Sequence, residues 1–454
     1  MTRQRLRISI GIILLIAATV RTGFLVRNWN NLDFAPSILL HAEVARNILH
    51  GRWFAVNQQY LDEYVAACTS QEKLLDLADM PPPTQETLEP LYNDEGGYGF
   101  LLAVIWKLTG SERWWQIRVL QVLLDIGMCF LVFQIGRKAF NERAGLLAAL
   151  LYAVFIPGIE LAVRPHRDIW VTFLFIFTVY QFVASSGGRP SLRQLAAIGV
   201  ATGLVAWMRS TVLLFVLLMP VVLFFSYQRK EWVRASIVLG AAFLLTFAPL
   251  IVRNYVVFDK FMATRGAFWH SFWAGIGQMP NQFDLRDDDS TVVLFAQSID
   301  PTAVLNTDHY EQVLKKKAFE FIGEHPWWYA GAVARRGMVF LFPKIGREVF
   351  FQPPLPQHVI GALNRSFGKV LVLVADGALS LMFLIGVWLN RARWKELSGL
   401  LYPYLYTLCT LAPFYLAGRN IMNVYFIVLL FASAAVVHFA GKVLPPPAHD
   451  GTVN

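Results

Sequence analysis

The sequence predicts an all-α protein, a bundle of about 10–12 membrane-spanning helices with interfacial helices in two large loops on one side of the membrane. Of its residues, 56% are hydrophobic and 16% are charged, whereas a soluble domain carries about 25% charged residues. The apolar residues form long runs, such as Ile8–Val20 and Thr211–Phe225. Because a helix needs about 20 mostly apolar residues to cross a bilayer, these runs exclude a soluble protein.

Ten apolar segments are predicted to span the membrane, and their orientation follows from the charges between them. They run approximately over 8–26, 116–136, 144–162, 168–186, 192–208, 211–228, 233–252, 368–390, 397–416 and 421–441. Lys and Arg gather before the first segment and after the second, fourth, sixth and eighth. Since positive loops stay on the cytoplasmic side, both termini are expected there. The first segment is interpreted as an uncleaved anchor rather than a signal peptide.

Three further apolar segments are predicted to lie in the membrane interface. Residues 35–49 form an amphipathic helical stripe, and residues 98–108 are too short to cross a bilayer. The run 327–342 carries Arg335 and Arg336 at its centre, which a spanning helix would have to bury. If this run does span, the number of spans becomes eleven.

Two large regions, 27–115 and 253–367, are expected outside the cytoplasm. We therefore divide the chain into an N-terminal transmembrane module (1–252, which includes the first outer region), the second outer region (253–367) and C-terminal transmembrane helices with a short cytoplasmic tail (368–454). The three cysteines imply no disulfide framework. The net charge of +9 comes from residues between apolar runs, so no nucleic-acid partner is expected.

Several short motifs follow one another in a recognisable order. They are Glu95-Gly-Gly-Tyr-Gly-Phe-Leu-Leu-Ala103, Arg118-Val-Leu-Gln121, Gly136-Arg-Lys-Ala-Phe140, Ala148-Ala-Leu-Leu-Tyr152, Pro157, Arg209, Arg253-Asn-Tyr255, His325-Pro326 and Arg419. In this order the sequence resembles the polyprenyl-phosphate-sugar-dependent glycosyltransferases of the GT-C class. Within that class it is most similar to the superfamily of protein O-mannosyltransferases and lipid A aminoarabinose transferases.

The resemblance implies an enzyme with the GT-C fold that moves a sugar from a polyprenyl-phosphate-linked donor to an acceptor on the extracytoplasmic face. The acceptor could be a lipid, a glycan or a protein. The expected location is the plasma membrane (the inner membrane of a bacterium), where membrane lipids surround the chain. No cofactor is expected, although the sequence leaves the need for a divalent metal open.

Two other functions are compatible with the sequence. One is a glycan polymerase or ligase that acts on polyprenyl-diphosphate-linked oligosaccharides. The other is a multi-pass transporter of lipids or glycans. Transporters often contain internal repeats, and we detect none between the two halves of this chain.

The implied reaction needs a carboxylate that accepts a proton from the acceptor hydroxyl. The candidates are Asp33, Glu43 and Asp168, and each also has a purely structural interpretation as a helix cap or a solvated side chain. Asp168 ends the turn Arg164-Pro-His-Arg-Asp168, and the resemblance implies an acidic residue there. The family also places an Asp early in the first outer helix, where this chain has Ser37, and a Tyr where it has His41.

The donor phosphate needs cations, and the guanidinium group of Arg matches its oxygens in pairs. The predicted substrate- and phosphate-binding residues are Arg164, His166, Arg167, Arg209, Arg253, Arg335, Arg336, Arg419, Asp94 and Glu95. The alternative for the arginines is that each reaches from a helix end to the membrane surface, which is also how Arg21 is interpreted. The run Asp287–Asp289 is interpreted as solvated, Asp125 as paired inside the bundle, and no metal ligands are predicted.

Overall fold

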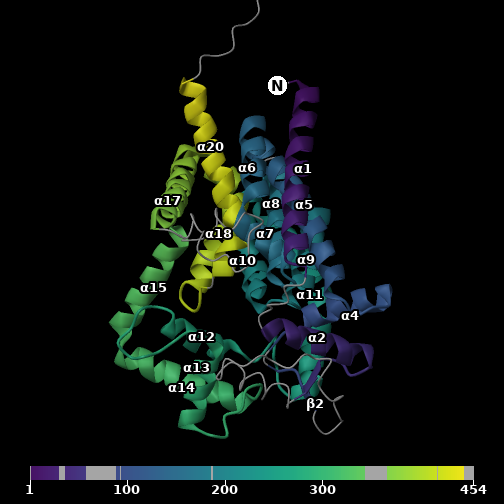
Figure 1. The fold of residues 1–454 in the computed structure, drawn as a ribbon, viewed down its shortest axis with the longest axis vertical. Helices are drawn as coiled ribbons and strands as arrows, with labels where there is room; N and C mark the ends of the chain where they lie inside the picture. Colours follow the sequence, from purple (N-terminus) through teal and green to yellow (C-terminus); the bar gives the residue numbers. More distant parts are fainter. Residues whose placement is uncertain are drawn as a thin grey trace, which may run out of the picture.

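Helices dominate the computed structural model, which describes residues 2–29, 36–57, 88–92, 94–185, 188–342, 366–416 and 418–443. Its elements are α1 (Arg3–Arg27), α2 (Pro36–Leu49), β1 (Ala55–Asn57), β2 (Leu88–Pro90), α4 (Gly97–Thr109), α5 (Trp114–Ala139), α6 (Glu142–Val154), α7 (Ile156–Val163), α8 (Asp168–Ala184), α9 (Leu192–Ala206), the 3-10 helix η3 (Ser210–Val212), α10 (Leu213–Ser226), α11 (Arg229–Phe258), α12 (Phe268–Gly277), α13 (Asp289–Ile299), α14 (Asp308–Glu324), α15 (Pro326–Leu341), α17 (Ser366–Leu389), the 3-10 helix η5 (Arg391–Arg393), α18 (Trp394–Leu411), α19 (Gly418–Met422) and α20 (Tyr425–Val443). Figure 1 shows a helical bundle above a layer of shorter elements.

The bundle confirms the predicted fold class, because every predicted span coincides with a helix or with a pair of helices that meet at a bend. By length and apolar composition, α1, α5 and α11 can each cross a membrane, and the number rises to five if the bent pairs α6–α7 (58°) and α17–α18 (63°) each form one span. This number is lower than the ten predicted, since the remaining apolar helices have only 10–17 residues. Leu217, Leu245 and Val256 nevertheless project from the bundle with most of their surface exposed, which suits contact with lipid.

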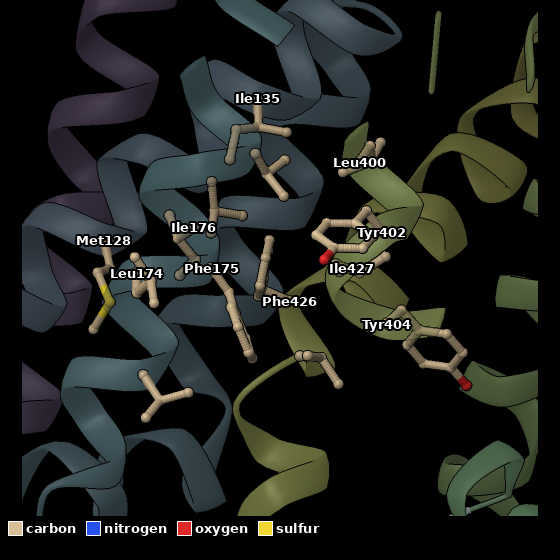
Figure 2. Packing of buried hydrophobic residues seen from close by; sticks show 14 of the residues in the cluster. Met128, Ile135, Leu174, Phe175, Ile176, Leu400, Tyr402, Tyr404, Phe426 and Ile427 are labelled. Atoms are coloured by element: carbon tan, nitrogen blue, oxygen red, sulfur yellow. The ribbon is translucent and has the colours of Figure 1, made fainter. Parts of the chain in front are cut away.

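The centre of the bundle is packed with aromatic and branched side chains from α5, α8, α18 and α20 (Figure 2). The rings of Phe175 and Phe215 lie 4.9 Å apart, and Tyr402 stacks on Phe215 at 4.8 Å. Small residues let the backbones approach closely. A Cβ atom on Gly136 would lie only 2.7 Å from the Cα atom of Gly145, so the glycine that begins the Gly136–Phe140 motif permits direct contact between α5 and α6.

Arg21 is fully buried in the bundle, where it forms an ion pair with Asp125. Its guanidinium also donates to the backbone carbonyl oxygen of Ala153 at 2.9 Å, and the Tyr152 hydroxyl donates to Asp125. The Ala153 carbonyl lies at the end of α6, just before the bend to α7. The expectation that Asp125 is paired inside the bundle is therefore met. The interpretation of Arg21 as a surface anchor was wrong. Arg21 is buried, where it neutralises the Asp125 carboxylate and donates to a backbone carbonyl that has no helical partner because α6 ends there.

The two outer regions come together at one end of the bundle, opposite the start of α1 and the end of α20 (Figure 1). In the first region α2 packs on α4 around Ala45, Tyr98 and Leu102. The strands β1 and β2 pair antiparallel in the register Ala55↔Pro90, Val56↔Glu89 and Asn57↔Leu88. In the second region α12, α13 and α14 share a separate apolar cluster.

Tyr92 ties the two outer regions together. Its backbone N–H donates to the side chain of Asn306 at 2.8 Å, and its hydroxyl donates to Asp308 at 2.6 Å. Its carbonyl oxygen accepts the N–H of Gly266 at 2.7 Å. The first outer region is therefore fixed against both the start and the middle of the second.

The segment with two central arginines forms α15, which runs obliquely beside the bundle from the outer layer toward α17 (Figure 1). Arg336 is buried and donates to the carbonyl oxygens of Ala412 (2.6 Å), Pro413 (3.0 Å) and Gly275. Arg335 lies on the exposed side of the same helix. The two arginines of this apolar run therefore differ in their surroundings. Arg336 joins α15 to the end of α18 and to α12, whereas Arg335 is exposed.

Replacement of Arg21 by leucine is expected to destabilise the protein strongly, because it leaves the Asp125 carboxylate buried without its cation. Removal of one partner of a buried ion pair costs about 3–5 kcal/mol. Thermal melting in detergent should show a lower midpoint for Arg21→Leu, with partial recovery in the double variant Arg21→Leu/Asp125→Leu. Arg7→Leu, on an exposed position of the same helix, is the matched control and should melt like the wild type. Equal melting of Arg21→Leu and the wild type would contradict a stabilising role for the pair.

Candidate active site

The turn between α7 and α8 is held in place by one face of α5. Arg118 donates from Nε to the carbonyl oxygen of Val163 at 3.0 Å, and Gln121 donates to the carbonyl oxygen of His166 at 2.8 Å. These two residues are three positions apart, so they lie on the same side of the helix. The Arg118–Gln121 motif therefore positions the turn that carries Arg164, His166, Arg167 and Asp168.

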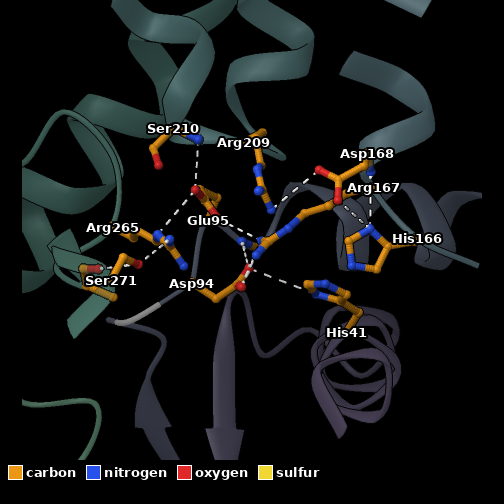
Figure 3. A network of polar contacts seen from close by, with 12 residues as sticks. His41, Asp94, Glu95, His166, Arg167, Asp168, Arg209, Ser210, Arg265 and Ser271 are labelled. Carbon is orange, nitrogen blue, oxygen red and sulfur yellow. Dashed lines mark hydrogen bonds and ion pairs between the residues drawn. The ribbon is translucent and has the colours of Figure 1, made fainter. Parts of the chain in front are cut away.

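Arg167 joins this turn to the first outer region through a double ion pair (Figure 3). Its Nη1 atom lies 2.8 Å from Asp94 and 2.7 Å from Glu95. Glu95 also accepts the backbone N–H of Ser210 at 2.7 Å and lies 3.3 Å from Nε of Arg265. Burial favours the protonated acids, but the neighbouring arginines prevail and hold the pKa of Asp94 and of Glu95 below the usual range. Both carboxylates are therefore ionised at neutral pH.

Asp168 is the centre of a second charged cluster next to the first (Figure 3). It is completely buried, with the ring of His166 at 3.0 Å, Arg209 at 3.4 Å and Arg419 at 3.6 Å. Arg209 is further oriented by the side chain of Asn420, which accepts from it at 3.0 Å. Asp168 thus gathers two arginines from distant helices at the mouth of the bundle, α19 supplying one and the end of α9 the other.

A cavity of about 550 Å³ opens beside these clusters. One wall is charged and includes His166, Arg167, Arg209 and Arg419 from the bundle and Asp94 from the first outer region. Its opposite wall comes from the second outer region and consists of Thr264, Arg265, Ala267, Phe268, His270, Ser271, Phe272, Ala274, Asp289, Ser290, Val293 and Leu305. The cavity therefore lies between the bundle and the outer layer.

One end of the cavity is apolar. Leu213, Leu214 and Leu217 of α10 line it together with Tyr406 and Leu411 of α18. Leu214 and Leu217 also belong to the exposed outer surface of the bundle, with 47% and 62% of their surface accessible. The cavity thus extends from a group of arginines to a part of the bundle surface that suits lipid.

The structure brings together most of the residues that the sequence singled out. Asp168, His166, Arg167, Arg209, Arg419, Asp94 and Glu95 are neighbours in the two clusters. Arg164 lies at the start of the same turn and is partly buried, close to the charges of Glu160 and Arg419. Asp33 lies outside the described residues.

Four predicted site residues lie elsewhere, and the structure gives them other surroundings. Glu43 accepts the backbone N–H of Asn57, and its burial raises its pKa to about 7. Arg253 donates to the carbonyl oxygens of Phe54 (3.0 Å) and Leu91 (3.2 Å). Arg336 binds carbonyl oxygens as described above, while Arg335 is exposed. None of the four lines the cavity. Glu43, Arg253 and Arg336 bind backbone groups instead, and the positions of these groups could not be predicted from the sequence.

The sequence analysis gave no role in the site to Arg265, His270 and Asp289, which line the cavity, or to His41, which lies beside Asp94 without lining it. Asp289 was interpreted as solvated; its side chain is 64% exposed, and it also contacts Nε2 of His270 at 3.1 Å on the cavity wall. His41 stands where the family resemblance implied a Tyr, and its ring lies 3.9 Å from Asp94. The alignment of position 41 with the Tyr of the family could therefore have indicated this histidine from the sequence. No comparable pattern surrounds Arg265 or His270.

No group of three or more His, Cys, Asp or Glu side chains within the described ranges is arranged to hold a metal ion. The acidic side chains of the two clusters face arginines instead. The guanidinium groups of Arg167, Arg209 and Arg419 contribute positive charge at this site.

The buried histidines predict a loss of stability in mild acid. Burial lowers the pKa of His41 and of His166 to about 4, against 6.5 for the free side chain. Between these two pH values the histidines are protonated in the unfolded chain but not in the folded chain. The free energy of unfolding therefore falls as the pH is lowered from about 6.5 to 4, by of order 3 kcal/mol for each histidine. Melting between pH 7.5 and 4.5 should show this trend, and His41→Asn should weaken it. His50→Asn, at an exposed position directly after the same helix, should leave the trend unchanged; an equal effect of both variants would contradict the assignment.

Comparison with known proteins supports the family resemblance in one segment and over the whole fold. Residues 97–252 match the family described as dolichyl-phosphate-mannose-protein mannosyltransferase. This segment contains the Arg118–Gln121 motif, the turn and Arg209. A search of curated proteins gives no match.

The solved structures with a similar fold include those of an oligosaccharyltransferase from Archaeoglobus fulgidus. The apo form is 13% identical, with a TM-score of 0.53 over 96% of this chain and 51% of that chain. A complex with Zn and sulfate is 14% identical, with a TM-score of 0.52 over 95% of this chain and 49% of that chain. A complex of the archaeal enzyme AglB with an inhibitory peptide and a dolichol-phosphate is 14% identical, with a TM-score of 0.51 over 96% of this chain and 50% of that chain.

The chain therefore spans about half the length of the solved structures that it matches. Sequence identities this low establish a similarity of fold and nothing further. Together with the matched segment, they confirm the resemblance first seen in the order of the motifs: the protein has the fold of the GT-C class of glycosyltransferases.

Proposed function

We propose that the protein is an integral membrane glycosyltransferase that moves a sugar from a polyprenyl-phosphate-linked donor to an acceptor on the extracytoplasmic face. The observation that carries this proposal is the cavity, which joins a group of arginines to an apolar opening on the lipid side. Such a cavity suits an amphiphile with an anionic head and a hydrocarbon tail. The matched family segment contributes His166, Arg167 and Arg209 to the cavity wall, and Asp168 lies buried beside Arg209.

The arginines of the site are prepared to receive a phosphate. Arg209 and Arg419 both point at Asp168, and Arg209 is also held by Asn420. Guanidinium groups bind phosphate oxygens through short, charge-assisted hydrogen bonds. Because Asp168 and Asn420 already fix the side chains, little conformational entropy remains to be lost when the phosphate binds.

The apolar end of the cavity accounts for the tail of the donor. Leu213, Leu214 and Leu217 lie in the first two turns of α10, and Leu411 of α18 lines the same cavity. Each methylene group that leaves water contributes about 0.8 kcal/mol. The first part of a polyprenyl chain would rest on these residues while the remainder stays in the bilayer.

The reaction is a substitution at the anomeric carbon of the sugar. The acceptor oxygen forms a bond to this carbon as the bond from the carbon to the phosphate oxygen breaks, and the electron pair of that bond leaves on the polyprenyl phosphate. Arg209 and Arg419 stabilise the negative charge that develops on the leaving phosphate. A carboxylate takes the proton from the acceptor hydroxyl.

An oligosaccharide donor is the main alternative, and the fold favours it as well. The similar solved structures are oligosaccharyltransferases, one of them bound to a dolichol-phosphate and an inhibitory peptide. In this alternative a polyprenyl-diphosphate-linked glycan would occupy the same arginines, as in a glycan polymerase or ligase. A lipid or glycan transporter with this fold would bind the same donor without cleaving it.

The location and partners of the protein form part of the same proposal. The start of α1 and the end of α20 lie at the same end of the bundle (Figure 1), and Lys and Arg near both the first span and the short loops assign this end to the cytoplasm. The membrane is then the plasma membrane, in bacteria the inner membrane. The acceptor is a lipid, a glycan or a protein with a free hydroxyl or amide. No cofactor is required in this scheme, since arginines supply the positive charge.

The test uses purified protein in detergent micelles, without vesicles. Radiolabelled polyprenyl-phosphate monosaccharides and polyprenyl-diphosphate oligosaccharides are supplied separately with a panel of lipid, glycan and peptide acceptors, with and without EDTA. Release of polyprenyl phosphate from a monosaccharide donor supports the proposal, and continued release in EDTA supports metal independence. Cleavage of diphosphate donors alone would assign the alternative. Binding of donors without any cleavage would favour a transporter.

Replacement of Arg209 by alanine is expected to lower kcat/KM for the donor about 100-fold or more, because it removes a fixed cation from the leaving phosphate. Asp168→Asn should have a similar effect, since Arg209 and Arg419 would lose the carboxylate that gathers them. Arg335→Ala, at an exposed position on α15, is the matched control and should stay within about twofold of the wild type. Initial rates over a range of donor concentrations give the comparison. Full activity of Arg209→Ala would remove the arginine cluster from the mechanism.

A further inference from the structure

His270 and Asp289 form a contact pair on the cavity wall that faces the arginine clusters. Nε2 of His270 lies 3.1 Å from Oδ1 of Asp289. The histidine comes from the first turn of α12 and the aspartate from the first residue of α13. Both residues line the cavity, together with Ser271 and Ser290 beside them.

The histidine is held from behind by α14. Its Nδ1 atom lies 2.6 Å from the hydroxyl of Tyr310, which is buried. The Glu311 carboxylate accepts the backbone N–H groups of Trp269 and His270 at 2.7 Å and 3.2 Å. The start of α12 is thus capped by a carboxylate from another helix, and the imidazole is fixed on both sides.

This arrangement defines the hydrogen bonding of the ring. When the Tyr310 hydroxyl donates to Nδ1, the proton of the neutral imidazole resides on Nε2 and is donated to Asp289. A carboxylate that receives such a bond is held in one orientation. Two consecutive residues of α14 therefore fix a histidine whose outer nitrogen orients an aspartate at the cavity.

Asp289 differs from the other carboxylates of the site in its access to the cavity. Its side chain is 64% exposed, whereas those of Asp94, Glu95 and Asp168 are 8%, 1% and 0% exposed. Each of these three is paired with arginine at 3.4 Å or less. His270, Arg419 and Arg265 also hold the pKa of Asp289 below its usual range, so its exposure, rather than its charged neighbours, distinguishes it from these three. Of the two carboxylates that line the cavity, Asp94 and Asp289, the latter is the one whose side chain is open to a substrate hydroxyl.

We infer that Asp289, oriented by His270, is the general base that takes the proton from the acceptor hydroxyl in the proposed transfer reaction. This inference rests on the proposed function and adds to it the residue that activates the acceptor. The acceptor oxygen loses its proton to Oδ2 of Asp289 as it forms the bond to the anomeric carbon. The phosphate leaves toward Arg209 and Arg419 on the opposite wall, and the proton then passes from Asp289 to water. His270 acts as a positioning residue.

The experiment separates proton removal from binding and folding by the use of azide. Azide is a nucleophile without a proton to remove, so it attacks the anomeric carbon without a base and gives a glycosyl azide and polyprenyl phosphate. Asp289→Asn is expected to lower kcat for transfer to a hydroxyl acceptor at least about 100-fold. Azide-dependent cleavage of a radiolabelled polyprenyl-phosphate sugar by the same variant should remain within about threefold of the wild type.

Three further variants complete the design. His270→Asn should lower hydroxyl transfer about tenfold and leave both azide-dependent cleavage and KM for the donor unchanged. Arg209→Ala should lower both reactions, since it acts on the leaving phosphate. Asp284→Asn removes the same charge from an exposed position in the loop before α13 and should leave both reactions at wild-type rates.

The outcomes distinguish this inference from the proposed function. Normal hydroxyl transfer by Asp289→Asn overturns the inference and leaves the proposed function intact. An equal loss of hydroxyl transfer and azide-dependent cleavage also overturns it, because a structural defect would explain both. If the wild-type protein cleaves no donor with either nucleophile, the proposed function fails and this inference fails with it.

Discussion

The Glu95 carboxylate is the contact on which the architecture of the site depends. It receives Arg167 from the turn before α8, the backbone N–H of Ser210 from the start of η3, and Arg265 from the segment before α12. One side chain therefore joins the first outer region, the bundle and the second outer region. Because the group is almost fully buried, its charge interacts strongly with these partners and would be costly to leave unpaired. Two of these partners, Arg167 and Arg265, line the cavity, and Ser210 lines it as well, so the carboxylate holds together three parts of the cavity wall.

This constraint explains how a membrane protein can hold several arginines at one site. Asp94, Glu95 and Asp168 compensate part of the positive charge of Arg167, Arg209, Arg265 and Arg419. An anionic ligand can then add to an arrangement whose geometry is already set, which is the condition for electrostatic preorganisation. The apolar wall of α10 extends the same site toward lipid, so that the two ends of the cavity match the two chemical parts of an amphiphilic donor.

Arginine has a second use in this fold, as a donor to backbone carbonyls that the helices leave open. Arg21 donates to a carbonyl at the bend after α6, and Arg118 donates to carbonyls at the ends of α1 and α7. Arg336 donates to a carbonyl at the end of α18. Each guanidinium carries five N–H groups in a rigid plane and can satisfy several carbonyls at once. In sequence these residues look like the arginines of the cavity, because both kinds interrupt apolar segments. Only the positions of the surrounding carbonyls and carboxylates tell the two uses apart.

The sequence by itself determined the helical membrane bundle, its two outer regions and the importance of the Arg164–Asp168 turn. These features follow from local properties, namely the length of apolar runs and the order of short motifs. The tertiary structure alone decided which charged residues meet. It brought Asp94 and Glu95 to Arg167, excluded Glu43 and Arg336 from the cavity, and placed His270 against Asp289. The physical reason is that an ion pair or hydrogen bond depends on distance in space, and residues far apart in the chain have no fixed distance until the helices pack.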